Sequence, residues 1–163
     1  MELTGAVALV TGVDTGPGSA AARLLATAGA AVALVAGRRD RLDELAAMID
    51  HTVLVVQADV AKQPEAVSAV ERTVAQFGRL DIVVLVGRVP EMLHVAHAAL
   101  LYLARAAADS PRGVADLIAL DGTPEAAELA DSLRRDLSDH GVRVSAIAPT
   151  EAQLAIALAV TGQ

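Results

Sequence analysis

Short hydrophobic runs alternate with longer amphipathic segments along this chain. The short runs are rich in Val, Leu and Ala, and they span residues 6–10, 31–36, 52–57, 81–86, 114–120 and 142–148. Continuous apolar runs of this length are typical of strands buried on both faces of a sheet. The longer segments have the apolar spacing of helices. They span residues 17–28, 39–49, 64–77, 91–108, 124–139 and 151–160.

This alternation predicts an α/β fold: a doubly wound, Rossmann-like parallel sheet of about six strands with helices on both faces. The turn residues agree with the prediction. Gly29 and Gly141 follow helical segments, where glycine commonly ends a helix. Pro17, Pro64 and Pro124 fall where a first-turn proline is tolerated. We find no repeat or linker, so residues 1–163 are expected to form a single domain.

A glycine-rich turn follows the first predicted strand. Its sequence is TGVDTGPG, residues 11–18. Gly12 permits a tight turn, Gly16 lets the backbone approach a pyrophosphate at a helix N-terminus, and Gly18 allows close helix packing. The turn therefore predicts a nucleotide site. Two residues oppose it: the Asp14 carboxylate repels a diphosphate unless it points away or caps an amide, and Pro17 has no N–H.

Composition excludes several other classes of function. The formal net charge is −7, and only Phe77 and Tyr102 are aromatic. This argues against nucleic acid and against an anionic membrane as partners. The apolar runs are too short for a membrane span. The absence of cysteine rules out thiolate chemistry and is consistent with a cytoplasmic protein.

The chain resembles the short-chain dehydrogenase/reductase family. The Thr-Gly-x-x-x-Gly-x-Gly spacing is that family's form of the glycine motif. The segments GRRDRLDELAAMI, VLVVQADVAKQPEAVSAVERTVAQFGRLDIVVLVG and SLRRDLSDHGVRVSAIAPT resemble family segments in the same order. The resemblance extends almost from end to end, and it implies the same doubly wound fold.

The resemblance also implies a nicotinamide dinucleotide as cofactor. Gly12, Gly16 and Gly18 would face its phosphates, with Asp14 and Thr15 in the same turn. Asp59 would accept a hydrogen bond from the adenine amino group, and Val60 would lie beside the ring. Where members that use NAD carry an acid, this chain has Ala36-Gly37-Arg38-Arg39. Arg38 and Arg39 suit a 2′-phosphate and favour NADP over NAD, unless they are merely solvated charges at a helix start.

The catalytic residues that the resemblance implies are missing. The family transfers hydride with a tyrosine, a lysine four residues later, a serine and an asparagine. Here the only tyrosine and lysine, Tyr102 and Lys62, are forty positions apart. Asp121 or Gly122 falls near the serine position and Thr123 near the lysine position. The usual Asn-Asn-Ala-Gly is replaced by Leu85-Val86-Gly87-Arg88, and Arg88 adds charge near the cofactor path. We therefore assign no catalytic residue.

A metal site is the other chemistry considered. Glu91, His94 and His97 are spaced by three on one predicted helix face. Carboxylate and imidazole groups are metal ligands. However, three collinear residues over two turns reach one ion poorly, and such polar edges are common on amphipathic helices. We assign no metal.

The leading hypothesis is a catalytically defective member that binds a nucleotide or acts as an assembly subunit. In this family two helices pair with those of a second subunit, and here they are residues 93–108 and 124–139. A second apolar stripe of Ala98, Leu101 and Tyr102 supports a homodimer or a complex with a full-length reductase. The alternatives are an NADP-dependent oxidoreductase with an atypical or partner-completed site, and a nucleotide sensor.

Overall fold

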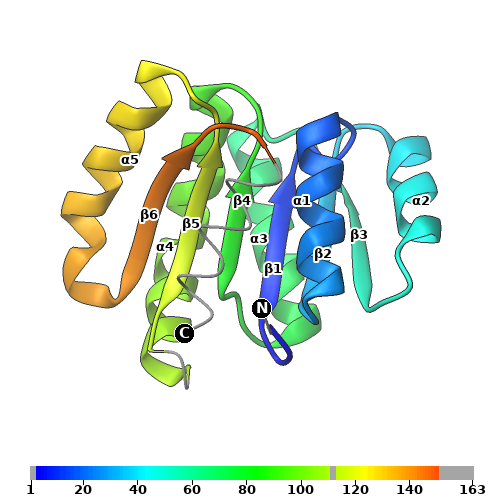
Figure 1. The fold of residues 1–163 in the computed structure, drawn as a ribbon, viewed down its shortest axis with the longest axis horizontal. Coiled ribbons are helices and arrows are strands. Elements are labelled where there is room, and N and C mark those ends of the chain that lie inside the picture. The colour runs from blue at the N-terminus through cyan, green and yellow to red at the C-terminus, as the bar shows by residue number, and fades with distance from the viewer. Residues whose placement is uncertain (1–2, 111–112, 151–163) are drawn as a thin grey trace.

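A six-stranded parallel sheet forms the centre of the molecule (Figure 1). The computed structural model describes residues 3–110 and 113–150. The strands are β1 (Val7–Thr11), β2 (Ala31–Ala36), β3 (Val53–Gln57), β4 (Ile82–Leu85), β5 (Ala115–Leu120) and β6 (Val142–Ile147). Their order in the sheet is β3-β2-β1-β4-β5-β6. The predicted doubly wound fold is confirmed.

Helices cover both faces of the sheet. The helices are α1 (Gly16–Thr27), α2 (Arg39–Met48), α3 (Gln63–Phe77), α4 (Val89–Asp109) and α5 (Pro124–Leu137), and a short 3-10 turn (Ser138–His140) follows α5. The cores of α1 and α2 pack together on one face, and those of α3, α4 and α5 pack on the other. The apolar segment 151–160, predicted as a helix, lies outside the described residues.

Element boundaries follow the local chemistry of each terminus. Thr15 and Thr123 cap α1 and α5 through their hydroxyls, and the prediction that Pro17, Pro64 and Pro124 sit in first turns is confirmed. Helix α4 begins at Val89, two residues before the predicted start, because Pro90 is also tolerated in a first turn.

The order of the strands creates a switch point between β1 and β4. Both β2 and β4 pair with β1, so Val10 lies between Leu34 and Val84. The chain turns to opposite sides of the sheet after these strands. Ligands of doubly wound sheets bind at the carboxyl ends of the strands beside such a switch point. The predicted glycine turn follows β1 at this position.

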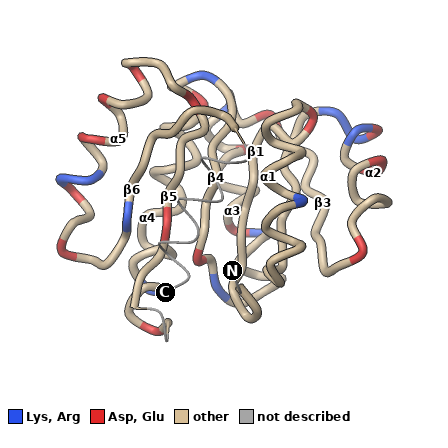
Figure 2. The backbone as a smooth tube through the Cα atoms, in the orientation of Figure 1, with Lys and Arg blue, Asp and Glu red and all other residues tan. Residues whose placement is uncertain are grey.

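Charged residues are concentrated on the helices, and the sheet carries few (Figure 2). At its amino edge, the buried Asp81 accepts hydrogen bonds from the Val7 amide (2.9 Å) and from both Arg79 Nε (2.8 Å) and Nη2 (2.6 Å). The hydrogen bonds to Asp81 raise the pKa of Arg79 above its ordinary value. Asp116 of β5 pairs with Arg143 of β6 at 3.3 Å. These ion pairs fix the edge opposite the switch point.

No helix within residues 3–110 and 113–150 has both the length and the hydrophobicity that a membrane span requires.

Removing the Asp81 carboxylate is expected to destabilise the fold. The substitution Asp81→Ala leaves the buried Val7 amide and Arg79 without their acceptor, which costs about 2 to 3 kcal/mol of unfolding free energy. Asp43→Ala, which removes an exposed partner of Arg39, is the matched control and costs less than about 0.5 kcal/mol. Urea denaturation measures both, and equal losses would contradict the role given to Asp81.

Candidate nucleotide site

Close backbone contacts shape the turn between β1 and α1. Gly12 has a positive φ of 63°, and a Cβ there would lie 2.8 Å from the Val86 carbonyl oxygen at the end of β4. A Cβ at Gly18 would overlap the Gly12 carbonyl oxygen and lie 2.6 Å from its carbon. Gly18 therefore allows α1 to pack against the turn itself. Both glycines are required by the fold, whether or not a ligand binds.

Gly16 differs from the other two glycines. No atom lies within 4 Å of a Cβ placed on it, and its φ is not positive. Nothing in the described fold demands glycine here. A glycine without a structural role, at the N-terminus of a helix, leaves room for a ligand to approach the backbone. This is the position that the sequence assigned to the pyrophosphate.

The hydroxyl of Thr15 occupies part of this helix terminus. It donates a hydrogen bond to the Gly12 carbonyl (2.7 Å) and accepts one from the Gly18 amide (3.2 Å). Because Pro17 has no N–H, Gly16 is left as the donor among the first three residues of α1. Thr15 thus stabilises the turn, and the amides available to an anion are fewer than the glycine spacing alone indicates.

Thr11 joins the end of β1 to the end of β4 through hydrogen bonds. Its buried hydroxyl accepts a hydrogen bond from the Val86 amide (3.0 Å) and donates one to the Val86 carbonyl (3.4 Å). The sequence alone indicates no such role for Thr11. The contact joins residues 75 positions apart, so only the tertiary structure reveals it.

A cavity of about 160 Å³ opens over the switch point. It is bounded by the glycine turn, the ends of β2, β3 and β4, and the first turn of α4. Its lining consists of Gly12, Asp14, Val35, Ala36, Gly37, Ala58, Asp59, Val60, Val86 and Glu91. Four of the predicted cofactor-binding residues, Gly12, Asp14, Asp59 and Val60, are thus brought together.

The loop after β3 holds Asp59 and Val60 in place. The Asp59 amide donates to Glu65 Oε1 (2.9 Å), and Asp59 Oδ1 accepts from the Ala61 amide (3.1 Å). His94 Nδ1 of α4 lies 2.9 Å from the Val60 carbonyl oxygen. Since a carbonyl only accepts, Nδ1 is the protonated nitrogen.

Arg38 and Arg39 lie outside the cavity lining. Arg38 pairs with Asp40 and Arg39 with Asp43, each at 3.2 Å and each well exposed. These are the ion pairs of a solvated helix start. The structure therefore does not bring the two arginines into the cavity, and their predicted contact with a 2′-phosphate stays a prediction.

The polar residues Glu91, His94 and His97 at the start of α4 have different surroundings and do not form one cluster. Glu91 lines the cavity and pairs with Arg88 at 3.2 Å, His94 binds the Val60 carbonyl, and His97 is exposed. Across residues 3–110 and 113–150, no three His, Asp or Glu side chains gather in a way that could hold a metal ion. Arg88 is 81% exposed and is not in the lining, although the sequence placed it near the cofactor path.

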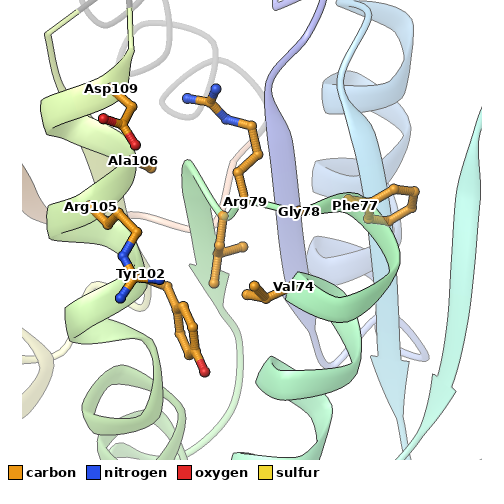
Figure 3. Close-up of a pocket in the computed structure, with 9 residues that line it drawn as sticks. Val74, Phe77, Gly78, Arg79, Tyr102, Arg105, Ala106 and Asp109 are labelled. Atoms are coloured by element: carbon orange, nitrogen blue, oxygen red, sulfur yellow. The ribbon is translucent and has the colours of Figure 1, made fainter.

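Tyr102 lies in a second cavity, at the other edge of the sheet (Figure 3). This space of about 180 Å³ lies between α3 and α4 and is lined by Val74, Phe77, Gly78, Arg79, Leu80, Tyr102, Arg105, Ala106 and Asp109. Residues 78–80 precede β4, so the cavity lies at the amino edge. Tyr102 is about 20 Å along α4 from Val89, at 1.5 Å per residue. Lys62 pairs with Glu65 at the carboxyl edge, so the fold separates the two.

Three residues, Asp121, Gly122 and Thr123, connect β5 to α5. Asp121 Oδ1 accepts from the Thr123 amide (2.9 Å), and the Thr123 hydroxyl accepts from the Ala126 amide (3.3 Å). The side chains of Asp121 and Thr123, which are nearest the expected serine and lysine positions, therefore stabilise the turn and cap the N-terminus of α5. No tyrosine or lysine lies in this connection.

A family model described as short chain dehydrogenase matches residues 6–99. The chain belongs to this family. The match includes the glycine turn, both strands of the switch point and the first half of α4. Membership of this family agrees with the nicotinamide cofactor that the sequence resemblance implies.

Two curated relatives illustrate the similarity to the family. A γ-butyrolactone 1′-reductase of the A-factor type (1S-forming) from Streptomyces virginiae is 48% identical over 83 residues, covering 48% of this chain and 32% of the relative. An oxidoreductase from Staphylococcus epidermidis is 28% identical over 175 residues, covering 88% of this chain and 76% of the relative. The chain thus matches only a third of the Streptomyces family member.

Solved structures share the fold. The 3-ketoacyl-(acyl-carrier-protein) reductase from Brucella melitensis, complexed with NADH, superposes with a TM-score of 0.80 at 22% identity. The superposition covers 90% of this chain and 76% of that one. A 7α-hydroxysteroid dehydrogenase complexed with NADH gives a TM-score of 0.79 at 18% identity. At these identities the likeness establishes the fold alone.

The two helical glycines are expected to respond differently to substitution. Gly18→Ala forces the backbone of the turn to move and should cost at least about 2 kcal/mol of unfolding free energy. Gly16→Ala meets open space and should stay within about 0.5 kcal/mol of the wild type. Thermal or urea denaturation measures both. A large loss from Gly16→Ala would show that Gly16 is needed by the fold.

Proposed function

We propose that this chain is a non-catalytic member of the short-chain dehydrogenase family that binds a dinucleotide and acts as a partner or assembly subunit. One observation carries the first part: the expected catalytic region is a three-residue connection between β5 and α5 whose side chains are used for capping. The glycine turn and the cavity beside it support the second part.

The described residues fit the adenosine half of such a cofactor. Gly16 leaves its backbone open to a phosphate, Asp59 keeps one carboxylate oxygen for an adenine amino group, and Val60 offers an apolar wall. When bound, a nicotinamide group can accept or supply a hydride. In this chain, no tyrosine–lysine pair is present to move the accompanying proton. A phenol with an ordinary pKa near 10 is a poor base at neutral pH without such a cation.

Assembly through α4 and α5 is supported by the exposure of Leu101. This side chain is 79% exposed in the middle of α4, while Ala98 and Tyr102 on the same side are half-buried. Leu100 of α4 and Leu129 of α5 are also partly uncovered. On this basis we propose that residues 93–108, together with residues 124–139, contact a second copy of this chain or a full-length reductase.

The alternative function is an NADP-dependent oxidoreductase whose active site is completed by a partner. The retained turn and cavity favour it over a purely structural subunit. A bound nucleotide that only reports redox state would need the same features. A cytoplasmic location remains a prediction from the sequence.

Binding without turnover is the expected outcome for the isolated protein. Calorimetry should detect a dinucleotide, NAD or NADP, while absorbance at the reduced nicotinamide band stays constant with a broad panel of carbonyl substrates. Gly16→Ala should abolish binding without loss of stability, because its methyl group occupies the space that a phosphate needs. Turnover that disappears in Gly16→Ala would contradict the non-catalytic proposal.

Dimer formation should depend on Leu101. Sedimentation velocity is expected to show a dimer for the wild type and a monomer for Leu101→Glu, since a charge would be placed in an apolar interface. Met48→Glu is the matched control, because Met48 of α2 is 59% exposed and lies away from α4 and α5. A wild-type monomer would contradict the homodimer, and a dimer that survives Leu101→Glu would contradict this surface.

A further inference from the structure

The cavity at the switch point is acidic. Asp14, Asp59 and Glu91 line it, and no lysine or arginine is among its described lining residues. The three carboxylates come from three different elements: the turn after β1, the loop after β3 and the first turn of α4. A site that binds the doubly charged 2′-phosphate of a nucleotide would be expected to have lysine or arginine side chains in its lining.

Three cations in the loops that border this cavity pair with acidic side chains. Arg38 pairs with Asp40, Lys62 with Glu65 and Arg88 with Glu91. The Arg88 side chain is 81% exposed, so it offsets the Glu91 charge from the solvent side. The lining that a ligand meets is therefore predominantly negative.

Asp14 borders the same cavity as the end of β2, where ribose recognition is expected in this fold. It shares the cavity with Ala36 and Gly37 at the end of β2. In dinucleotide-binding folds, an acid about 20 residues after the glycine motif accepts a hydrogen bond from the ribose 2′-hydroxyl. Here that place holds Gly37, around which no atom lies within 4 Å of a Cβ position. Asp14, in the turn after β1, lines the same space.

The Asp14 carboxylate is available to a ligand. Its residue is exposed, and within residues 3–110 and 113–150 no hydrogen bond or ion pair engages its oxygens. A carboxylate accepts hydrogen bonds from hydroxyl groups and repels a phosphate. The same group can therefore favour one form of the adenosine ribose and oppose the other.

We infer that Asp14 takes the place of the acid missing from the end of β2 and restricts the cavity to adenosine whose ribose carries a free 2′-hydroxyl. This inference rests on the proposed function. It assigns NAD, rather than NADP, as the dinucleotide that the site accepts. Arg38 and Arg39, which led the sequence analysis to NADP, then remain solvated charges of α2.

Two ligands that differ by one phosphate test the inference. Calorimetry compares adenosine 5′-monophosphate with adenosine 2′,5′-bisphosphate. The wild type should bind the monophosphate at least about tenfold more tightly. Asp14→Asn should bring the two affinities within about threefold, mainly by improving the bisphosphate. The wild-type preference should weaken at high salt, because the repulsion is screened.

Arg38→Gln is the matched control and should leave the ratio unchanged. A wild type that prefers the bisphosphate, or a ratio that Asp14→Asn does not alter, would overturn the inference while the proposed function stands. A folded protein that binds neither ligand and no dinucleotide would instead overturn the proposed function. Circular dichroism confirms that each variant is folded.

Discussion

Backbone contact between the glycine turn and the end of β4 is the constraint on which the site depends. Gly12 lies against the Val86 carbonyl, Gly18 lies against Gly12, and Thr11 bonds both the amide and the carbonyl of Val86. Side chains at either glycine would push the two strand ends apart. Since β1 and β4 flank the switch point, the same contacts that close the core also create the cavity above it.

The fold of the family does not depend on the residues that carry the family's chemistry. Six strands and the crossover helices need only apolar runs, caps and glycines, and all are present. Hydride transfer needs a proton donor beside the nicotinamide, and the family places it after β5. Three residues remain there, enough to turn the chain and cap α5. This connection contains no tyrosine or lysine, and the sheet and its helices form without them.

Charged side chains are arranged differently at the amino ends and at the carboxyl ends of the strands. At the amino edge, Arg79 and Asp81 neutralise one another, and Arg143 pairs with Asp116. At the carboxyl edge, the cavity gathers acids that have no cation beside them in the lining. The first arrangement stabilises the sheet. We propose that the second influences which ligands can approach, because charge near a partly enclosed space is screened less than charge on an open surface.

The sequence by itself determined the fold and the position of the glycine turn. Apolar runs that are buried on both faces and alternate with capped helices predict a parallel, doubly wound sheet. The glycine spacing marks the turn after the first strand. The sequence could not determine the cavity lining. Asp14, Asp59 and Val60 were predicted as cofactor-binding and do line the cavity, but the sequence did not assign Glu91 to it. The contact predicted for Arg38 with a 2′-phosphate stays a prediction. The hydrogen bonds of Thr11 to Val86 and of His94 to Val60 could not be predicted from the sequence either, because each joins residues far apart along the chain. Local patterns fix elements, whereas contacts between elements arise only when the chain is packed.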